Sequence, residues 1–312
     1  MSTYAKAVLG IGVAVAAPIV TLAATAPAPA AVHATTATVV ATVQGDNKPL
    51  DAAPDPGGRT IYFTTEGADG PAILRVAAGG GSVATVLRGA PLVHPDGIAV
   101  SRDGNRLFVA DRGAGRILVV PVGGGRPRTL AGSAGTSPRG LEIQRRGAAS
   151  RIVFTGADPS DGRRGVFALP ASGARSPAVL AKGAPLRLPR AIAIARSGAI
   201  YVSDRGSGRR LGGRVLNIAG GHVTQIASGI RLGAPAGLAL TEDERTLLVS
   251  ARHPGAGTAQ VVLVDTKTRA RGTFDDVIRQ SHAAGGLHRA FASPLMAWAD
   301  SSRAGRIYRI DP

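Results

Sequence analysis

Three arginines stand at comparable places in a sequence that repeats itself, and their side chains are well suited to binding chemistry. Arg139 in SPRGLEI, Arg190 in LPRAIAI and Arg289 in LHRAFAS each come just before or within a short apolar run. Guanidinium groups bind carboxylates, phosphates and sulfated sugars through paired hydrogen bonds. If the runs are neighbouring strands around one axis, the three groups converge on an anion site. The alternative is that they pair with Asp96 and with backbone carbonyls and seal the same space.

Three further residues lie beside this set. Asp96 in HPDGIAV takes the corresponding place in another repeat and is the only acidic residue at the places compared. His94 lies two residues before Asp96, and His288 directly precedes Arg289. Both histidines are therefore candidates for the mouth of a central channel, where the three arginines would converge. A metal or general-base role is open to them. No H-x-x-x-H spacing occurs, so an exposed loop position is the simpler expectation for each.

A second recurrent set consists of aspartates. Asp111, Asp204 and Asp300 each end a short apolar run, in VADRG, VSDRG and WADSS. An aspartate at such a place accepts hydrogen bonds from the N–H groups of the following turn. The set therefore predicts three structural turns and no catalysis.

An internal repeat indicates how all these residues are positioned. Short apolar patterns such as IYF, LFV and IVF recur at intervals of 45 to 49 residues, at Ile61, Leu107, Ile152, Ile200, Leu247 and Met296. A short apolar run and a turn usually precede each of them, and a glycine-rich turn, a third run and in most repeats a fourth run follow. Units of this length with four short antiparallel strands are typical of propeller blades. The predicted fold is therefore all-β, a six-bladed β-propeller of four-stranded antiparallel blades.

The two ends of the chain complete the count of strands. The sixth repeat stops at Pro312, just after its third strand, and the isolated run TATVVATV, 36–43, precedes the first repeat. A strand from the N-terminal end that supplies the missing fourth strand would close the ring and leave no open sheet edge. We expect this closure.

The first 34 residues have the pattern of a signal peptide. Lys6 is followed by an apolar stretch, an Ala/Pro-rich stretch and VHA, which resembles an A-x-A cleavage site. Pro18 and the small residues make the stretch a poor membrane span, so an uncleaved anchor is the lesser alternative. The expected organisation is a signal peptide over 1–34 and the propeller over 35–312, in a periplasmic or secreted protein without stable membrane insertion.

Composition excludes several classes of function. The chain has 312 residues and no cysteine, which excludes disulfides, thiolate zinc sites and cysteine nucleophiles. Its net charge of +17 comes almost wholly from arginines scattered along the chain, while aromatic residues make up 4%. Recognition of single-stranded nucleic acid depends on aromatic stacking. Together with the export signal, this argues against a nucleic-acid partner.

The repeat that contains PDGIAV, LFVADRGAGRI and a trailing GGG resembles NHL-repeat propellers and the senescence-marker-protein/gluconolactonase family. The resemblance implies a lactonase with one divalent cation such as calcium on the channel axis, held by a Glu, two Asn and an Asp at the starts of inner strands. In the first repeat, KPLDAAPDP offers Leu50 or Asp51 and no Glu. The other starts carry Asp96, Arg139, Arg190, Ala236 and Arg289. A hard cation needs several oxygen ligands around one point, and this set supplies few.

The expected function follows from that ring. We expect an exported, monomeric propeller that binds a small anionic molecule or a protein partner at the channel mouth, without catalysis and without a cofactor. The alternative is a gluconolactonase-like hydrolase acting on a lactone or sugar derivative. No G-x-S-x-G, H-E-x-x-H or P-loop motif occurs, so whether the protein is an enzyme stays open. The start of the insertion 273–288 has the pattern of a short helix. The insertion is either a lid over the channel or a surface loop.

Overall fold

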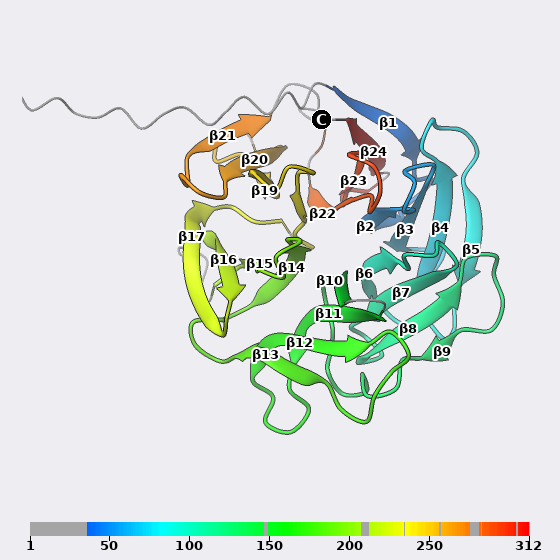
Figure 1. The fold of residues 1–312 in the computed structure, drawn as a ribbon. Helices are drawn as coiled ribbons and strands as arrows, with labels where there is room; N and C mark the ends of the chain where they lie inside the picture. The colour runs from blue at the N-terminus through cyan, green and yellow to red at the C-terminus, as the bar shows by residue number, and fades with distance from the viewer. Residues whose placement is uncertain are drawn as a thin grey trace, which may run out of the picture.

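The protein forms a ring of six β-sheets, each of four antiparallel strands (Figure 1). The structure is a computed structural model that describes residues 36–146, 149–206, 212–233, 235–255, 257–274, 281, 283–303 and 305–311. No helix in these ranges is long and apolar enough to cross a membrane. The predicted fold class is confirmed.

The blades follow one another along the chain, and each runs from an inner strand at the channel to an outer strand. Blade 1 contains β2 (Lys48–Pro54), β3 (Thr60–Glu66), β4 (Ala72–Ala77) and β5 (Ala84–Arg88). Blade 2 contains β6 (Pro95–Val100), β7 (Arg106–Asp111), β8 (Arg116–Pro121) and β9 (Arg128–Thr129). Blade 3 contains β10 (Leu141–Arg146), β11 (Ala149–Ala157), β12 (Arg164–Pro170) and β13 (Ala178–Lys182).

The remaining blades repeat this order. Blade 4 contains β14 (Pro189–Ile194), β15 (Ile200–Asp204), β16 (Gly213–Ala219) and β17 (His222–Ile230). Blade 5 contains β18 (Leu238–Leu240), β19 (Thr246–Arg252), β20 (Ala259–Asp265) and β21 (Arg271–Phe274). Blade 6 contains β22 (Ala284–Arg289), β23 (Met296–Asp300), β24 (Arg306–Asp311) and β1 (Thr36–Thr42), which joins from the other end of the chain.

The apolar runs of the sequence form the middle strands because these are buried on both faces between neighbouring blades. The six positions that mark the repeat all lie in the second strand of a blade, and each is buried. Between blades 2 and 3, Phe108 and Ile117 pack with Phe154 and Phe167. Full burial of one such side chain contributes roughly 1.5–3 kcal/mol. The contacts between blades therefore hold the ring together and set the positions of the inner strands.

The predicted closure corresponds to the pairing of β1 with β24. Residues Thr36 to Thr42 run antiparallel to Asp311 to Arg306, with a register shift between Val39 and Ala41. Figure 1 shows β1 at the rim of blade 6, beside β24. The N-terminal and C-terminal parts of the described chain therefore belong to one sheet.

The inner strands of blades 2, 3 and 4 approach one another closely at the channel. A Cβ atom on Gly97 would lie 2.3 Å from the carbonyl oxygen of Arg139, and one on Gly140 would lie 2.2 Å from that of Arg190. No side chain fits in these gaps. The glycines therefore let the backbones that carry the two arginines come together.

Replacing Gly140 by alanine is expected to lower the free energy of unfolding by about 1–3 kcal/mol, because the added methyl group must displace the Arg190 backbone. Urea denaturation of the purified variant would measure the loss. Gly123→Ala is the matched control, since a Cβ there meets no atom within 4 Å. Equal stability of the two variants would show that the close approach is not needed.

Candidate functional site

The starts of the inner strands surround a small cavity on the channel axis. Asp96, Arg139, Arg190 and Ala236 line it, together with Asp51 and His288. In blade 2 the pairing of β6 with β7 shifts register between Pro95 and Gly97, at Asp96. In blade 4 the corresponding shift lies after Pro189, at Arg190. We call the end of the channel lined by Asp96, Arg139, Arg190 and Ala236 the first mouth.

Arg289 lies elsewhere. In blade 6 the register shifts between Ala284 and Leu287, so that Gly285 takes the place of Arg190 and Arg289 pairs with Met296 at the end of β22. Its side chain donates hydrogen bonds to the carbonyl oxygens of Leu240, Ala290 and Ser293. Blades 1, 2 and 4 have the same one-residue shift, so the shift does not distinguish blade 6. The sequence-based alignment of LHR with LPR was wrong, because Ala284, which pairs with Asp300, takes the place of Pro189, which pairs with Asp204. Arg289 therefore does not join Arg139 and Arg190.

Arg289 lines a larger cavity of about 520 Å³ at the opposite end of the channel. The ends of all six inner strands form its wall, at Pro54, Val100, Ile143, Ile194, Leu240 and Arg289. We call this end of the channel the second mouth. The channel thus has a narrow space behind the first mouth and a wide one behind the second.

Asp96 collects three cationic or potentially cationic partners at the first mouth. Its carboxylate accepts a hydrogen bond from Arg112 Nε at 2.7 Å and lies 2.9 Å from His94 Nε2 and 3.5 Å from Arg139 Nη1. Burial raises the pKa of Asp96, but the hydrogen bonds and charges of His94 and Arg112 outweigh it and leave the pKa below its ordinary value. Asp96 is therefore ionised and already paired.

Arg139 and Arg190 are not fully satisfied by this carboxylate. The Nε atom of each is buried and has no hydrogen-bond partner among the described residues. Burial, followed by the charge of Arg139, lowers the pKa of Arg190 to about 10, and burial also lowers that of Arg139. Desolvated guanidinium groups with unused donors favour an anion. The first mouth therefore has an excess of positive charge and of hydrogen-bond donors.

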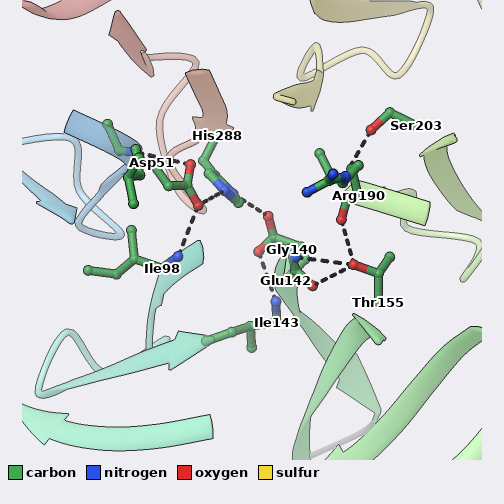
Figure 2. Close-up of polar contacts among 12 residues, drawn as sticks. Asp51, Ile98, Gly140, Glu142, Ile143, Thr155, Arg190, Ser203 and His288 are labelled. Carbon is green, nitrogen blue, oxygen red and sulfur yellow. Dashed lines mark hydrogen bonds and ion pairs between the residues drawn. The ribbon is translucent and has the colours of Figure 1, made fainter. Parts of the chain in front are cut away.

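A three-residue bridge crosses the channel between the two mouths. His288 of β22 lies with Nε2 3.0 Å from Asp51 Oδ2 and with Nδ1 3.1 Å from Glu142 Oε2 (Figure 2). Asp51 belongs to β2 and also accepts a hydrogen bond from the backbone N–H of Ile98, at 2.9 Å. Blades 1, 3 and 6 are joined at this point. His288 lines both cavities, so the bridge separates them.

The bridge holds a proton in the interior. Burial lowers the pKa of His288, but the charge of Asp51 and the hydrogen bonds with Asp51 and Glu142 raise it overall, to about 10. The imidazole is thus a cation at neutral pH and donates from both ring nitrogens. The sequence favoured an exposed loop position for His288. This expectation is wrong, because the side chain lies in a strand and is almost wholly buried.

Neither histidine of the channel is free to bind a metal. Both ring nitrogens of His288 face carboxylates, and so do those of His94, which lies between Glu66 and Asp96 at 2.5 and 2.9 Å. A metal-bound imidazole needs one nitrogen with a free lone pair. The described residues contain no group of three or more His, Asp or Glu side chains that could hold a metal ion.

The recurrent aspartates hold turns, as the sequence predicts. Asp111 accepts hydrogen bonds from the backbone N–H groups of Val93, His94 and Ala114. Asp204 and Asp300 accept equivalent bonds from Leu188 and Ala283. Asp111 therefore also sets the position of His94. The three aspartates therefore hold the segments that lead into the inner strands β6, β14 and β22 at the first mouth.

Several predicted features lie outside the described residues. They are the signal peptide, 1–34, and residues 275–280 and 282 of the insertion 273–288, where the short helix is expected. The residues that sequence analysis missed are Glu142 and Arg112. Asp51 was considered only as a residue at the place where the family resemblance implies a Glu ligand. Glu142 and His288 take equivalent places in their inner strands. Glu142 follows Leu141, which pairs with Phe154. His288 follows Leu287, which pairs with Trp298.

Comparisons with known proteins support the fold. No family model matches the sequence, and no curated protein matches it. Among solved structures, a gluconolactonase from Xanthomonas campestris has a TM-score of 0.66 and 19% identity, over 88% of this chain and 89% of that one. A chain of the nidogen/laminin complex has a TM-score of 0.62 and 22% identity, over 78% of this chain and 85% of that one. The chain therefore shares the six-bladed β-propeller fold with these proteins.

This likeness concerns the fold alone, and propellers of similar shape differ in activity. Virginiamycin B lyase from Staphylococcus aureus has a TM-score of 0.57 and 13% identity, over 89% of this chain and 99% of that one. A fold shared by a lactonase and a lyase does not determine the chemistry of its channel. That chemistry depends on the residues that line the channel.

The first mouth does not fit the divalent cation that the family resemblance implies. The six inner-strand starts carry Leu50, Asp96, Arg139, Arg190, Ala236 and Gly285. Only one of these side chains is a carboxylate, and Arg112 and Arg139 already contact it. Two guanidinium groups at the same ring would repel a cation. The donor set fits an anion better than a metal.

Proposed function

We propose that this protein is an exported propeller that binds a small anionic ligand at the first mouth, without catalysis. The observation that carries the proposal concerns the Nε atoms of Arg139 and Arg190, which are buried and have no hydrogen-bond partner in the part of the chain that the structure describes. The guanidinium groups of Arg112, Arg139 and Arg190 share one carboxylate, that of Asp96, as their counter-charge. An anion that inserts here completes the hydrogen bonds and offsets the repulsion.

The size of the space limits how an anion binds. The cavity between these side chains measures about 20 Å³, which holds a group about the size of one water molecule. A single oxygen of a carboxylate or phosphate fits against Arg139 and Arg190, while the rest of the molecule remains outside the mouth. An acidic side chain of a protein partner would present the same group, and this partner is the second candidate.

The proposal includes localisation and assembly. The pattern of residues 1–34 supports export to the periplasm or beyond. The low aromatic content argues against a nucleic-acid partner. Size-exclusion chromatography with light scattering of the purified protein would test the expected monomer.

Binding of citrate, phosphate and galacturonate measured by calorimetry at low salt tests the proposal. We expect roughly millimolar to micromolar affinity for at least one of them, since several charge-assisted hydrogen bonds act together. Arg190→Ala should weaken binding about tenfold or more, and added salt should weaken binding to the unaltered protein. Arg128→Ala is the control for net charge, because Arg128 is exposed on the outer strand β9.

Two results would contradict this function. One is the absence of any anion binding at low salt. The other is binding that remains unchanged in both Arg139→Ala and Arg190→Ala, which would make these arginines a structural plug. Binding that falls equally in Arg128→Ala would reflect net charge and not the first mouth.

Hydrolysis of a lactone is the alternative, and the likeness to the Xanthomonas campestris gluconolactonase favours it. It requires oxygen ligands for a cation where this chain has arginines. We expect no stoichiometric calcium in the purified protein and no gluconolactone hydrolysis above the background rate with or without added calcium. Elemental analysis and a titration of released acid measure the two. A calcium-dependent rate would replace the binding proposal with the enzymatic one.

A further inference from the structure

Blades 2 and 4 each bring an arginine to the first mouth from the end of their second strand. Arg112 follows β7, and Arg205 follows β15. The backbone N–H of Arg112 donates a hydrogen bond to the carbonyl oxygen of His94 at 3.0 Å, and that of Arg205 donates to Leu188 at 3.1 Å. His94 and Leu188 each precede the proline that begins an inner strand. The two arginines therefore take equivalent places.

The charges that these two arginines meet are opposite. Arg112 Nε donates a hydrogen bond to Asp96 at 2.7 Å. In blade 4 Arg190 takes the place of Asp96, since each follows the first proline of its inner strand. The pKa of Arg190 is lowered by burial, by the charge of Arg139 and also by that of Arg205, which therefore lies nearby. Arg205 thus has a cation where Arg112 has a carboxylate.

Blade 3 adds a further arginine and lacks the aspartate that holds the turn in blades 2 and 4. Gly156 takes the place in β11 that Asp111 takes in β7, four residues after the marker of the repeat. Arg164 begins β12 and is half-buried. After burial, its charge is among the causes that lower the pKa of Arg139. A third blade therefore contributes positive charge without a carboxylate of its own.

The acidic residues of the neighbouring turns are already engaged. Lys182 Nζ lies 2.6 Å from Asp158 Oδ2 and 2.9 Å from Asp161 Oδ2, in the turn between β11 and β12. Arg214 Nη2 lies 2.7 Å from Asp204 Oδ2 in blade 4. Among the described residues of blades 2 to 4, Asp96 is thus the carboxylate shared by five guanidinium groups. They belong to Arg112, Arg139, Arg164, Arg190 and Arg205.

A ligand can meet most of this charge only from outside the channel. The cavity between Arg139 and Arg190 measures about 20 Å³ and holds one oxygen. Further charged groups of the same ligand therefore lie outside it, beside Arg164 and Arg205, which we call the rim arginines. Blade 1 presents Glu66 instead, with its side chain 30% exposed. Repulsion from this carboxylate directs an anionic ligand towards blades 3 and 4.

We propose that the ligand of the first mouth is a compact polyanion with three or more negative charges. Its end group enters between Arg139 and Arg190, and its next charged groups bind the rim arginines. This ligand class rests on the anion site proposed above. Oligophosphates and oligocarboxylates share the closely spaced acidic oxygens that it requires, and guanidinium groups bind both through paired hydrogen bonds.

Two series of anions test the ligand class. Binding of phosphate, pyrophosphate and tripolyphosphate would be compared by calorimetry at one low ionic strength, and acetate would be compared with citrate. Tripolyphosphate should bind about tenfold or more tightly than phosphate, because additional charge-assisted hydrogen bonds form at the rim. The series with the greater gain identifies the source of the acidic groups. A gain in either series supports the proposal.

Variants then locate the additional charges on the rim. Arg205→Ala and Arg164→Ala should each weaken the best-bound polyanion about tenfold and leave phosphate within about twofold, because phosphate reaches only the inner pair. Arg190→Ala should weaken both ligands. Arg205 is exposed, so its truncation leaves the packing of the blades intact. Arg128→Ala, on β9, makes the same change in net charge and should bind as the unaltered protein does.

The outcomes separate this inference from the anion site itself. Equal affinities within both series, or a polyanion that binds equally well to both rim variants, would overturn the polyanion class. The anion site would still stand if Arg190→Ala weakened binding. A loss in Arg128→Ala as large as in Arg205→Ala would assign the effect to net charge and overturn the class as well. No binding of any anion would overturn both proposals.

Discussion

A chain that lacks Thr36–Thr42 is expected to aggregate and to lose the cooperative unfolding of a closed ring. Without β1, the edge of β24 is left with unpaired backbone N–H and C=O groups, the usual template for pairing between molecules. The deletion also removes Val40 and Ala41, which pack with Ile61 and Phe63 of blade 1. The contact between blades 6 and 1 therefore weakens at the same time.

Size-exclusion chromatography with light scattering and a thermal denaturation curve would measure this effect. The deletion should start after residue 35 so that the segment 1–34 is unchanged. Val39→Thr is the control, because Val39 is 43% exposed and the substitution keeps the backbone pairing of β1. A monomeric deletion variant with an unaltered melting temperature would show that β1 does not close the ring.

Replacing His288 by alanine is expected to destabilise the protein by about 3–5 kcal/mol at pH 7. The substitution removes the cation between Asp51 and Glu142 and leaves the buried Asp51 and the half-buried Glu142 without a counter-charge. Urea denaturation would measure the change. His222→Ala should change stability little, because His222 is exposed in β17. A similar loss in both variants would exclude a special contribution from the bridge.

The pH dependence of stability provides an independent measurement of the same bridge. The pKa of His288 rises from 6.5 to about 10 on folding, so the folded state binds a proton that the unfolded state releases. The contribution is complete below pH 6.5 and is lost as the pH rises towards 10. Between these values the free energy of unfolding should fall by about 1.4 kcal/mol per pH unit more than in His288→Gln. Parallel curves would mean that His288 is neutral in the folded protein.

The regular blades could be predicted because their determinants are local and repeated six times. Each blade has its own apolar runs and glycine turns, and the marker positions such as Ile61 and Met296 all lie in second strands. Closure was also predictable, since TATVVATV is a strand without a repeat of its own. The pair Arg139 and Arg190 follows from local pattern too, because a proline precedes each at the start of an inner strand.

Where the local pattern changed, the prediction for the site failed. LHR has no proline before its arginine, and strand pairing places Gly285, not Arg289, at the position that Arg190 takes in blade 4. Which residue of a repeat stands at the start of the inner strand is decided by strand pairing across the blade, and the short motif LHR does not reveal it. A Cβ atom on Gly286 would lie 1.6 Å from Asp51 Oδ1, so this glycine makes room for the bridge itself.

The sequence alone determined the all-β class, the six blades and a cationic ring near Arg139 and Arg190, because these depend on period and residue type. Only the tertiary structure decided that His288 lies between Asp51 and Glu142, which are 237 and 146 residues away along the chain. In a ring, the inner strands of distant blades face one another across the channel. Contacts across that axis depend on the closure and diameter of the whole ring, and no local pattern records them.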